Sequence, residues 1–121
     1  MDGILIIDKP SGITSHDVVD EVRRRLGIRR VGHAGTLDPM ATGVLVILVG
    51  KATRLASSYL NEEKEYWAGI RLGISTDTGD RDGKIMEQRE ISPFPPDRIT
   101  ATLKKFEGEI WQSPPPYSAI H

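Results

Sequence analysis

The rest of this sequence is organised around the twelve residues Gly32-His33-Ala34-Gly35-Thr36-Leu37-Asp38-Pro39-Met40-Ala41-Thr42-Gly43. Three glycines and a proline in so short a span are incompatible with a regular helix. Because the stretch runs directly into the apolar segment Val44–Val49, it predicts a constrained loop that leads into a buried central strand. Asp38 is its only carboxylate, and the small residues on both sides would let a substrate come close. An isolated Asp-Pro pair, by contrast, is more often a simple turn.

Hydrophobic periodicity predicts a mixture of strands and helices along the chain. In order, the predicted segments are a strand at Gly3–Ile7, a helix that Thr14 or Ser15 caps and Gly27 ends, a strand at Val44–Val49, a helix at Lys51–Asn61, strands at Glu65–Ile74 and Lys84–Ile91, a helix from Pro95 to Gly108, a short strand at Glu109–Gln112 and an extended Pro114–His121. The alternation in Glu65–Ile74 places Tyr66 on the buried face of its strand. We therefore predict an α+β fold, a mainly antiparallel mixed sheet with flanking helices and no internal domain boundary.

Composition excludes several classes of function. The chain has 121 residues, 38% of them hydrophobic, and no cysteine, so disulfides and cysteine-based metal sites are excluded. No apolar run approaches the roughly 20 residues that span a bilayer, which predicts a cytoplasmic protein with no membrane partner. Asp80-Arg81-Asp82-Gly83 resembles part of a calcium loop, but Thr78 and Arg89 stand where that loop needs carboxylates, so we predict no metal site.

Charge is unevenly distributed. The formal net charge is −1, yet the segment Val22–Arg54 contains seven basic residues against Asp38 alone. A basic segment around a lone carboxylate suits a substrate whose phosphates are bound nearby, although basic clusters are more often solvated helix faces.

The complete string Gly32–Gly43 closely resembles the catalytic loop of the TruB family of pseudouridine synthases. Asp8-Lys9-Pro10 and Ser75-Thr76-Asp77-Thr78-Gly79-Asp80 are similar to two further motifs of that family. The resemblance covers nearly all of the chain but only the N-terminal part of such an enzyme, an incomplete pseudouridine synthase catalytic domain. It implies that a later arginine that pairs with Asp38, the rest of the sheet and an RNA-binding PUA domain are missing here or lie on a second polypeptide, and that residues 1–121 alone are inactive.

The resemblance implies a tRNA pseudouridine-55 synthase, which flips the T-loop uridine of transfer RNA out of its stack and isomerises it. Asp38 matches the catalytic aspartate. The base leaves ribose C1′ through N1 and returns through C5, so no metal, nucleotide or redox cofactor is needed. An ionised carboxylate could attack C1′ or C6, or remove the C2′ proton, and all three routes stay open.

Four further residues are implied to bind the substrate. Tyr66 matches an active-site tyrosine on which the flipped base would stack, although strand tyrosines are usually core residues. His33 would contact RNA near the vacated stack, whereas an isolated loop histidine usually bonds backbone. Arg54, which matches a basic position of the family, and Arg30 would contact phosphates, although either could be ordinary surface charge.

Two alternatives stay open. A catalytically silent RNA-binding module would use the same basic surface, but it would gain nothing from Asp38, which repels phosphates. A guide-RNA-dependent pseudouridine synthase of the same superfamily typically has serine where this sequence has Ala34, which favours the stand-alone type.

Overall fold

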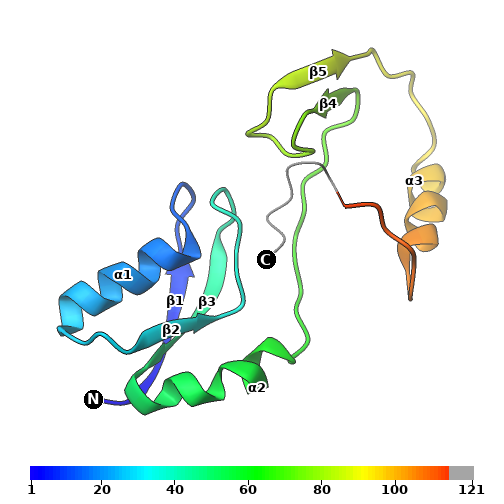
Figure 1. Ribbon diagram of the computed structural model, residues 1–121. Coiled ribbons are helices and arrows are strands. Elements are labelled where there is room, and N and C mark those ends of the chain that lie inside the picture. The colour runs from blue at the N-terminus through cyan, green and yellow to red at the C-terminus, as the bar shows by residue number, and fades with distance from the viewer. Residues whose placement is uncertain (115–121) are drawn as a thin grey trace. The chain divides into compact units, whose positions relative to one another are not determined.

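The computed structural model describes residues 1–114, which form an α+β arrangement of antiparallel sheets and helices (Figure 1). In chain order the elements are β1 (Gly3–Lys9), α1 (Ser15–Leu26), β2 (Val31–Ala34), β3 (Gly43–Val49), the 3-10 helix η1 (Gly50–Leu55), α2 (Ala56–Leu60), β4 (Ile74–Thr76), β5 (Ile85–Gln88), α3 (Pro96–Leu103) and the 3-10 helix η2 (Lys104–Phe106). The chain divides into two compact units, one ending at Tyr66 and the other starting at Trp67, where the sequence predicted no boundary.

The first unit is built on a three-stranded antiparallel sheet with β3 in the centre. Val44–Val49 was predicted as the central strand, and this prediction is confirmed. Ile7 of β1 and His33 of β2 lie opposite Leu45 and Ile47 of β3, respectively. The loop of residues 35–42 joins β2 to β3, so the sheet holds both ends of the segment that carries Asp38.

Helix α1 begins and ends where local sequence signals place its caps. The Thr14 hydroxyl accepts a hydrogen bond from the Asp17 backbone N–H at 2.9 Å, and the Asp17 carboxylate accepts one from the Thr14 N–H at 2.9 Å. The pKa of the Asp17 carboxyl is lowered, first by the hydrogen bond from the Thr14 backbone N–H and then by the Thr14 side chain. Gly27 ends the helix in the left-handed conformation with φ of 64°. Thr14 is therefore the cap, and Ser15 is free for another role.

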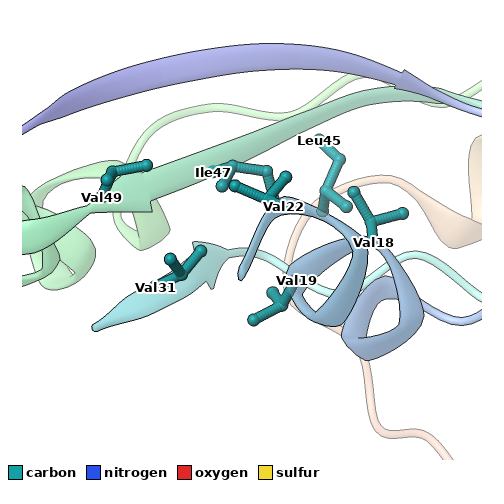
Figure 2. Close-up of a cluster of buried hydrophobic side chains, with 7 residues drawn as sticks. All are labelled: Val18, Val19, Val22, Val31, Leu45, Ile47 and Val49. Carbon is teal, nitrogen blue, oxygen red and sulfur yellow. The ribbon is translucent and has the colours of Figure 1, made fainter. Parts of the chain in front are cut away.

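The hydrophobic core lies between α1 and one face of this sheet (Figure 2). Its buried members are Val18, Val19 and Val22 of α1, Val31 of β2, and Leu45, Ile47 and Val49 of β3. On the opposite face, η1 and α2 lie against β2, and Leu48 is fully buried. The predicted burial of the first strand is only partly right, because β1 is an edge strand whose Ile6, on this second face, is 63% exposed.

The segment Lys51–Asn61 departs from its prediction. In place of one α-helix, the structure has six residues of 3-10 helix followed by five of α-helix. The preceding turn explains the change, since Gly50 adopts φ of 63° and its N–H bonds the Arg30 carbonyl at 2.7 Å. This bond ties the start of the segment to the residue before β2, so the chain enters the helix through a tight turn.

The second unit contains the β4–β5 hairpin and α3. The predicted pairing of two strands here is confirmed, but the predicted strand Glu65–Ile74 is wrong over most of its length. Tyr66 lies outside any strand and is 65% exposed, where the sequence placed it on a buried face. A strand requires a ladder partner, and within residues 1–114 no segment pairs with residues 65–72.

Three predictions concern the end of the chain. The helix near Pro95 forms as α3 and η2, yet its apolar stripe of Ile99, Leu103 and Phe106 is exposed. The short strand predicted at Glu109–Gln112 does not form. The extended conformation predicted for Pro114–His121 lies, from residue 115 on, outside the described residues.

Candidate functional site

Asp38 lies in the loop between β2 and β3, and its side chain is exposed. Its backbone carbonyl accepts a hydrogen bond from the Ala41 N–H at 2.9 Å, which closes a turn around Pro39. Within residues 1–114, no hydrogen bond or ion pair engages the Asp38 carboxylate. The side chain is therefore accessible to a substrate, while the backbone that carries it is folded into a turn.

Ser15 fixes the residue immediately before Asp38. Its hydroxyl accepts a hydrogen bond from the Leu37 N–H at 2.9 Å and donates one to the Leu37 carbonyl at 3.2 Å. Ser15 is buried at the start of α1, so the first turn of a helix holds Leu37 by both of its backbone polar groups.

Lys9 fixes the residue immediately after Asp38. Its side chain has no exposed surface, and its ammonium group donates to the carbonyls of Pro10, Ile13 and Pro39 at 2.8, 2.7 and 3.1 Å. An ammonium has three N–H donors, so these three carbonyls satisfy it completely. The Gly12 N–H also bonds the Pro39 carbonyl, at 2.7 Å.

The Asp38 carboxylate is thus presented by a backbone clamped on both sides, with Ser15 on one and Lys9 on the other. Such rigidity suits a catalytic group, because a reacting atom must be held in one geometry. If Asp38 and Pro39 only formed an ordinary turn, no buried lysine from thirty residues earlier in the chain would be needed to hold it.

His33 lies on β2 and is half-buried. Its Nδ1 lies 3.2 Å from the Gly35 carbonyl, a contact that fits an Nδ1–H donor. In that tautomer Nε2 is left as an acceptor, and the ring stands at the entrance to the loop that carries Asp38. The backbone contact that an isolated histidine usually makes is therefore present. His33 lies on a strand, however, and not within the loop as the sequence predicted, and its contact with RNA stays a prediction.

The basic residues of α1 are engaged in internal pairs. Arg24 and Arg25 both bind the Glu21 carboxylate, at 2.6 and 2.8 Å, and their hydrogen bonds lower its pKa to about 2. Arg23 binds Asp20 at 3.2 Å and the carbonyls of Arg29 and Val31. The excess positive charge counted from Val22 on is therefore partly neutralised by acidic residues one turn earlier.

Of the seven basic residues in Val22–Arg54, four are exposed and form no ion pair within residues 1–114. We call these four the basic corner: Arg29, Arg30, Lys51 and Arg54. Arg30 donates from Nε to the Thr53 hydroxyl at 2.9 Å, so the start of β2 and η1 meet here. The structure therefore brings Arg30 and the segment carrying Arg54 together. Tyr66 is not brought to this site by any hydrogen bond within residues 1–114.

Sequence reasoning missed the roles of Lys9, Ser15 and Thr53. Each forms its decisive bond with a residue at least 22 positions away, which no local pattern indicates. The described residues contain no group of three or more His, Asp or Glu side chains able to hold a metal ion. None of the helices in residues 1–114 is long and apolar enough to cross a membrane.

Comparison with known proteins gives consistent matches. The family model described as TruB family pseudouridylate synthase (N terminal domain) matches residues 23–121. The tRNA pseudouridine synthase B of Opitutus terrae is 48% identical over 120 residues, which are 99% of this chain and 50% of that protein. The same enzyme of Thermobifida fusca is 55% identical over 119 residues, 98% of this chain and 41% of that protein. A chain in the structure of an H/ACA RNP bound to a substrate RNA containing 2'-deoxyuridine matches with a TM-score of 0.60 and 32% identity, over 93% of this chain and 30% of that one.

An antiparallel α+β fold that carries one exposed carboxylate on a clamped loop after β2 and a basic corner near the other end of β2 fits the class named by the family model and both relatives, the pseudouridine synthases. Within that class, this chain belongs to the TruB family of pseudouridylate synthases. It spans about half, or less, of the length of the relatives it matches.

Proposed function

We propose that the protein carrying these residues isomerises the T-loop uridine of transfer RNA to pseudouridine, with Asp38 as the catalytic residue. The observation that carries the proposal is the double clamp, which fixes the backbone at Leu37 and Pro39 and leaves the carboxylate between them exposed. The two relatives named above are both tRNA pseudouridine synthases, which supports transfer RNA as the substrate.

The reaction redistributes bonds without net oxidation. The bond from ribose C1′ to uracil N1 breaks, the base turns over, a bond from C1′ to C5 forms, and the proton on C5 is released while N1 gains one. An ionised carboxylate serves this sequence as a nucleophile at C1′ or C6, or as a base at C2′. Asp38 would carry out one of these steps.

The other residues would bind and position the RNA. A paired or stacked uridine is inaccessible, so the base must leave the stack and lie on a flat side chain, for which Tyr66 is the candidate. His33 would contact the RNA beside the loop, and Arg30 and Arg54 of the basic corner would bind backbone phosphates. In the first unit Tyr66 is largely exposed, which leaves its ring free to meet a base.

Asp38 also argues against a module that only binds RNA. An exposed carboxylate repels phosphates, so a module that only binds RNA would gain nothing from Asp38. The guide-dependent alternative has less support, since the relatives named tRNA pseudouridine synthase B are 48% and 55% identical and the chain from the RNP is 32% identical.

Replacing Asp38 with asparagine in the full-length protein tests the proposal. The amide keeps the shape of the side chain but is a very poor nucleophile and base, so tritium release from C5-labelled uridine in a transfer RNA substrate should be abolished. Affinity for the same RNA should stay within about threefold, because docking uses other groups.

Asp17→Asn is the matched control. Asp17 serves the helix cap, so its loss should lower stability and leave the rate per folded molecule unchanged. Tritium release at a near wild-type rate by Asp38→Asn would refute the assignment of Asp38.

A further inference from the structure

Thr53 connects two segments that are distant in sequence. Its hydroxyl donates a hydrogen bond to the Gly50 carbonyl at 2.9 Å and accepts one from Nε of Arg30 at 2.9 Å. A hydroxyl has one proton, so donation to Gly50 leaves its lone pairs for the arginine, and the direction of both bonds is defined.

The backbone reinforces this connection. The Gly50 N–H donates to the Arg30 carbonyl at 2.7 Å, so the main chain and the side chain of Arg30 are tied to the same turn. The Thr53 methyl faces β2, since a Cβ added to Gly32 would lie 3.9 Å from Cγ2. With its methyl against a strand and its hydroxyl bonded twice, Thr53 has one favoured rotamer.

Arg30 is consequently the one member of the basic corner whose side chain is held by the described residues. Nε is occupied by Thr53, while the two terminal NH₂ groups bind none of residues 1–114 and the side chain is exposed. A guanidinium held at Nε presents its remaining N–H donors as a planar fork, which is the geometry that binds phosphate in a bidentate manner.

Arg30 stands apart from the reacting centre. It precedes β2, whereas the loop with Asp38 follows it, and four strand residues at about 3.3 Å each separate the two ends by about 13 Å. A group at this distance contacts the RNA backbone away from the flipped base, so it contributes to binding rather than to chemistry.

We propose that Thr53 is a positioning residue that fixes the Arg30 guanidinium so that its two free NH₂ groups bind a backbone phosphate of the RNA substrate. The inference rests on the proposed function, because it takes RNA as the ligand, and it adds how one phosphate contact is preorganised. Fixing the side chain before the RNA arrives removes part of the ordering cost from binding.

A double-mutant cycle between Thr53 and Arg30 tests this proposal in the full-length protein. Thr53→Val keeps the side-chain shape and removes both hydrogen bonds, and we expect it to weaken affinity for a T-stem-loop RNA about threefold to tenfold. Thr53→Ser should restore most of that affinity. In an Arg30→Ala background, Thr53→Val should have no further effect, because the group that it positions is gone.

The same variants separate positioning from a purely structural role. A structural loss at the Gly50 turn would persist after Arg30→Ala, so additive effects would overturn the proposal, as would a Thr53→Ser variant no better than Thr53→Val. In the tritium-release assay, Thr53→Val should raise KM with kcat unchanged, and a lower kcat at constant KM would also overturn it.

The outcomes distinguish this inference from the proposed function. If the wild-type protein releases tritium from transfer RNA while the two substitutions act additively, the proposed function stands and the positioning role is wrong. If the wild-type protein neither binds the T-stem-loop nor releases tritium, the proposed function is wrong and the phosphate contact falls with it.

Discussion

The buried ammonium of Lys9 donates a hydrogen bond to the carbonyl oxygen of Pro39 at 3.1 Å, directly after the exposed carboxylate of Asp38. One side chain from the end of β1 thus helps to hold a loop thirty residues further along the chain. Its charge does not reach solvent, because all three of its donors are used by backbone carbonyls. The role of Lys9 is therefore to hold the loop.

Lys9→Met should destabilise the protein and disorder the Asp38 loop. Methionine fills a similar volume but removes the Lys9 donor from the carbonyls of Pro10, Ile13 and Pro39, of which Pro39 keeps the Gly12 N–H. Each carbonyl left buried without a donor costs about 1–3 kcal/mol. Urea unfolding should show a lower midpoint than for the wild type. The exposed Lys51 offers the matched control, and Lys51→Met should change stability by less than about 0.5 kcal/mol. Equal midpoints for the two variants would contradict the clamp.

Ser15→Ala should loosen the loop from the other side. It removes both bonds to Leu37, and we expect a loss of about 1–2 kcal/mol together with faster hydrogen exchange at the Leu37 amide. The cap of α1 does not depend on Ser15. Amide hydrogen exchange in the middle of that helix should therefore change only as far as the free energy of unfolding of the whole protein changes. If the Leu37 amide keeps its protection, the Ser15 hydroxyl does not hold it.

RNA affinity should respond to the basic corner and not to α1. Arg54→Ala should weaken binding of a T-stem-loop RNA and reduce the slope of log affinity against log salt by about one. Arg24→Ala should change both quantities little, because Arg24 is already paired with Glu21. Titrations across a range of salt concentrations measure both effects. If Arg54→Ala and Arg24→Ala gave the same slope of log affinity against log salt, the ion pair of Arg24 with Glu21 would not keep Arg24 from binding RNA.

Stability should fall with acid in a window set by Glu21. Its pKa is lowered from 4.5 to about 2 by hydrogen bonds from Arg24 and Arg25, so the folded protein binds fewer protons than the unfolded chain between these values. The stabilisation from Glu21 is complete above pH 4.5 and is lost as the pH falls toward 2. Urea midpoints at pH 5 and pH 3 should differ less for Glu21→Gln than for the wild type, most clearly at low salt. If the midpoints at pH 5 and pH 3 differ as much in Glu21→Gln as in the wild type, Glu21 does not cause the loss of stability in acid.

Local sequence patterns were sufficient for β1, α1 and β3, but not for β2, whose residues Gly32–Ala34 were predicted as part of the loop. The four-residue spacing of Val18, Val22 and Leu26, with Thr14 and Gly27 at the ends, predicted α1 because a helix and its caps are formed by neighbours in sequence. The apolar run after Gly43 predicted the central strand for the same reason. Asp38 could be singled out because it is the only carboxylate in a loop whose glycines and proline limit its conformation.

The failed predictions depended on partners that periodicity does not reveal. Residues 65–72 alternate as a strand would, yet a strand forms only where another chain segment supplies hydrogen bonds, and Tyr66 is exposed instead of buried. The charge count has a different cause, since it began at Val22 and so left out Glu21, which binds both Arg24 and Arg25.

The sequence by itself determined the strands β1 and β3, the capped helix α1 and the identity of the loop, since these depend on residues within one or two turns of each other. Only the tertiary structure decided that Ser15 and Lys9 hold that loop and that Thr53 holds Arg30. The physical reason is that a buried polar group must find a partner wherever the packed chain provides one, and that partner's position in the sequence follows from the packing.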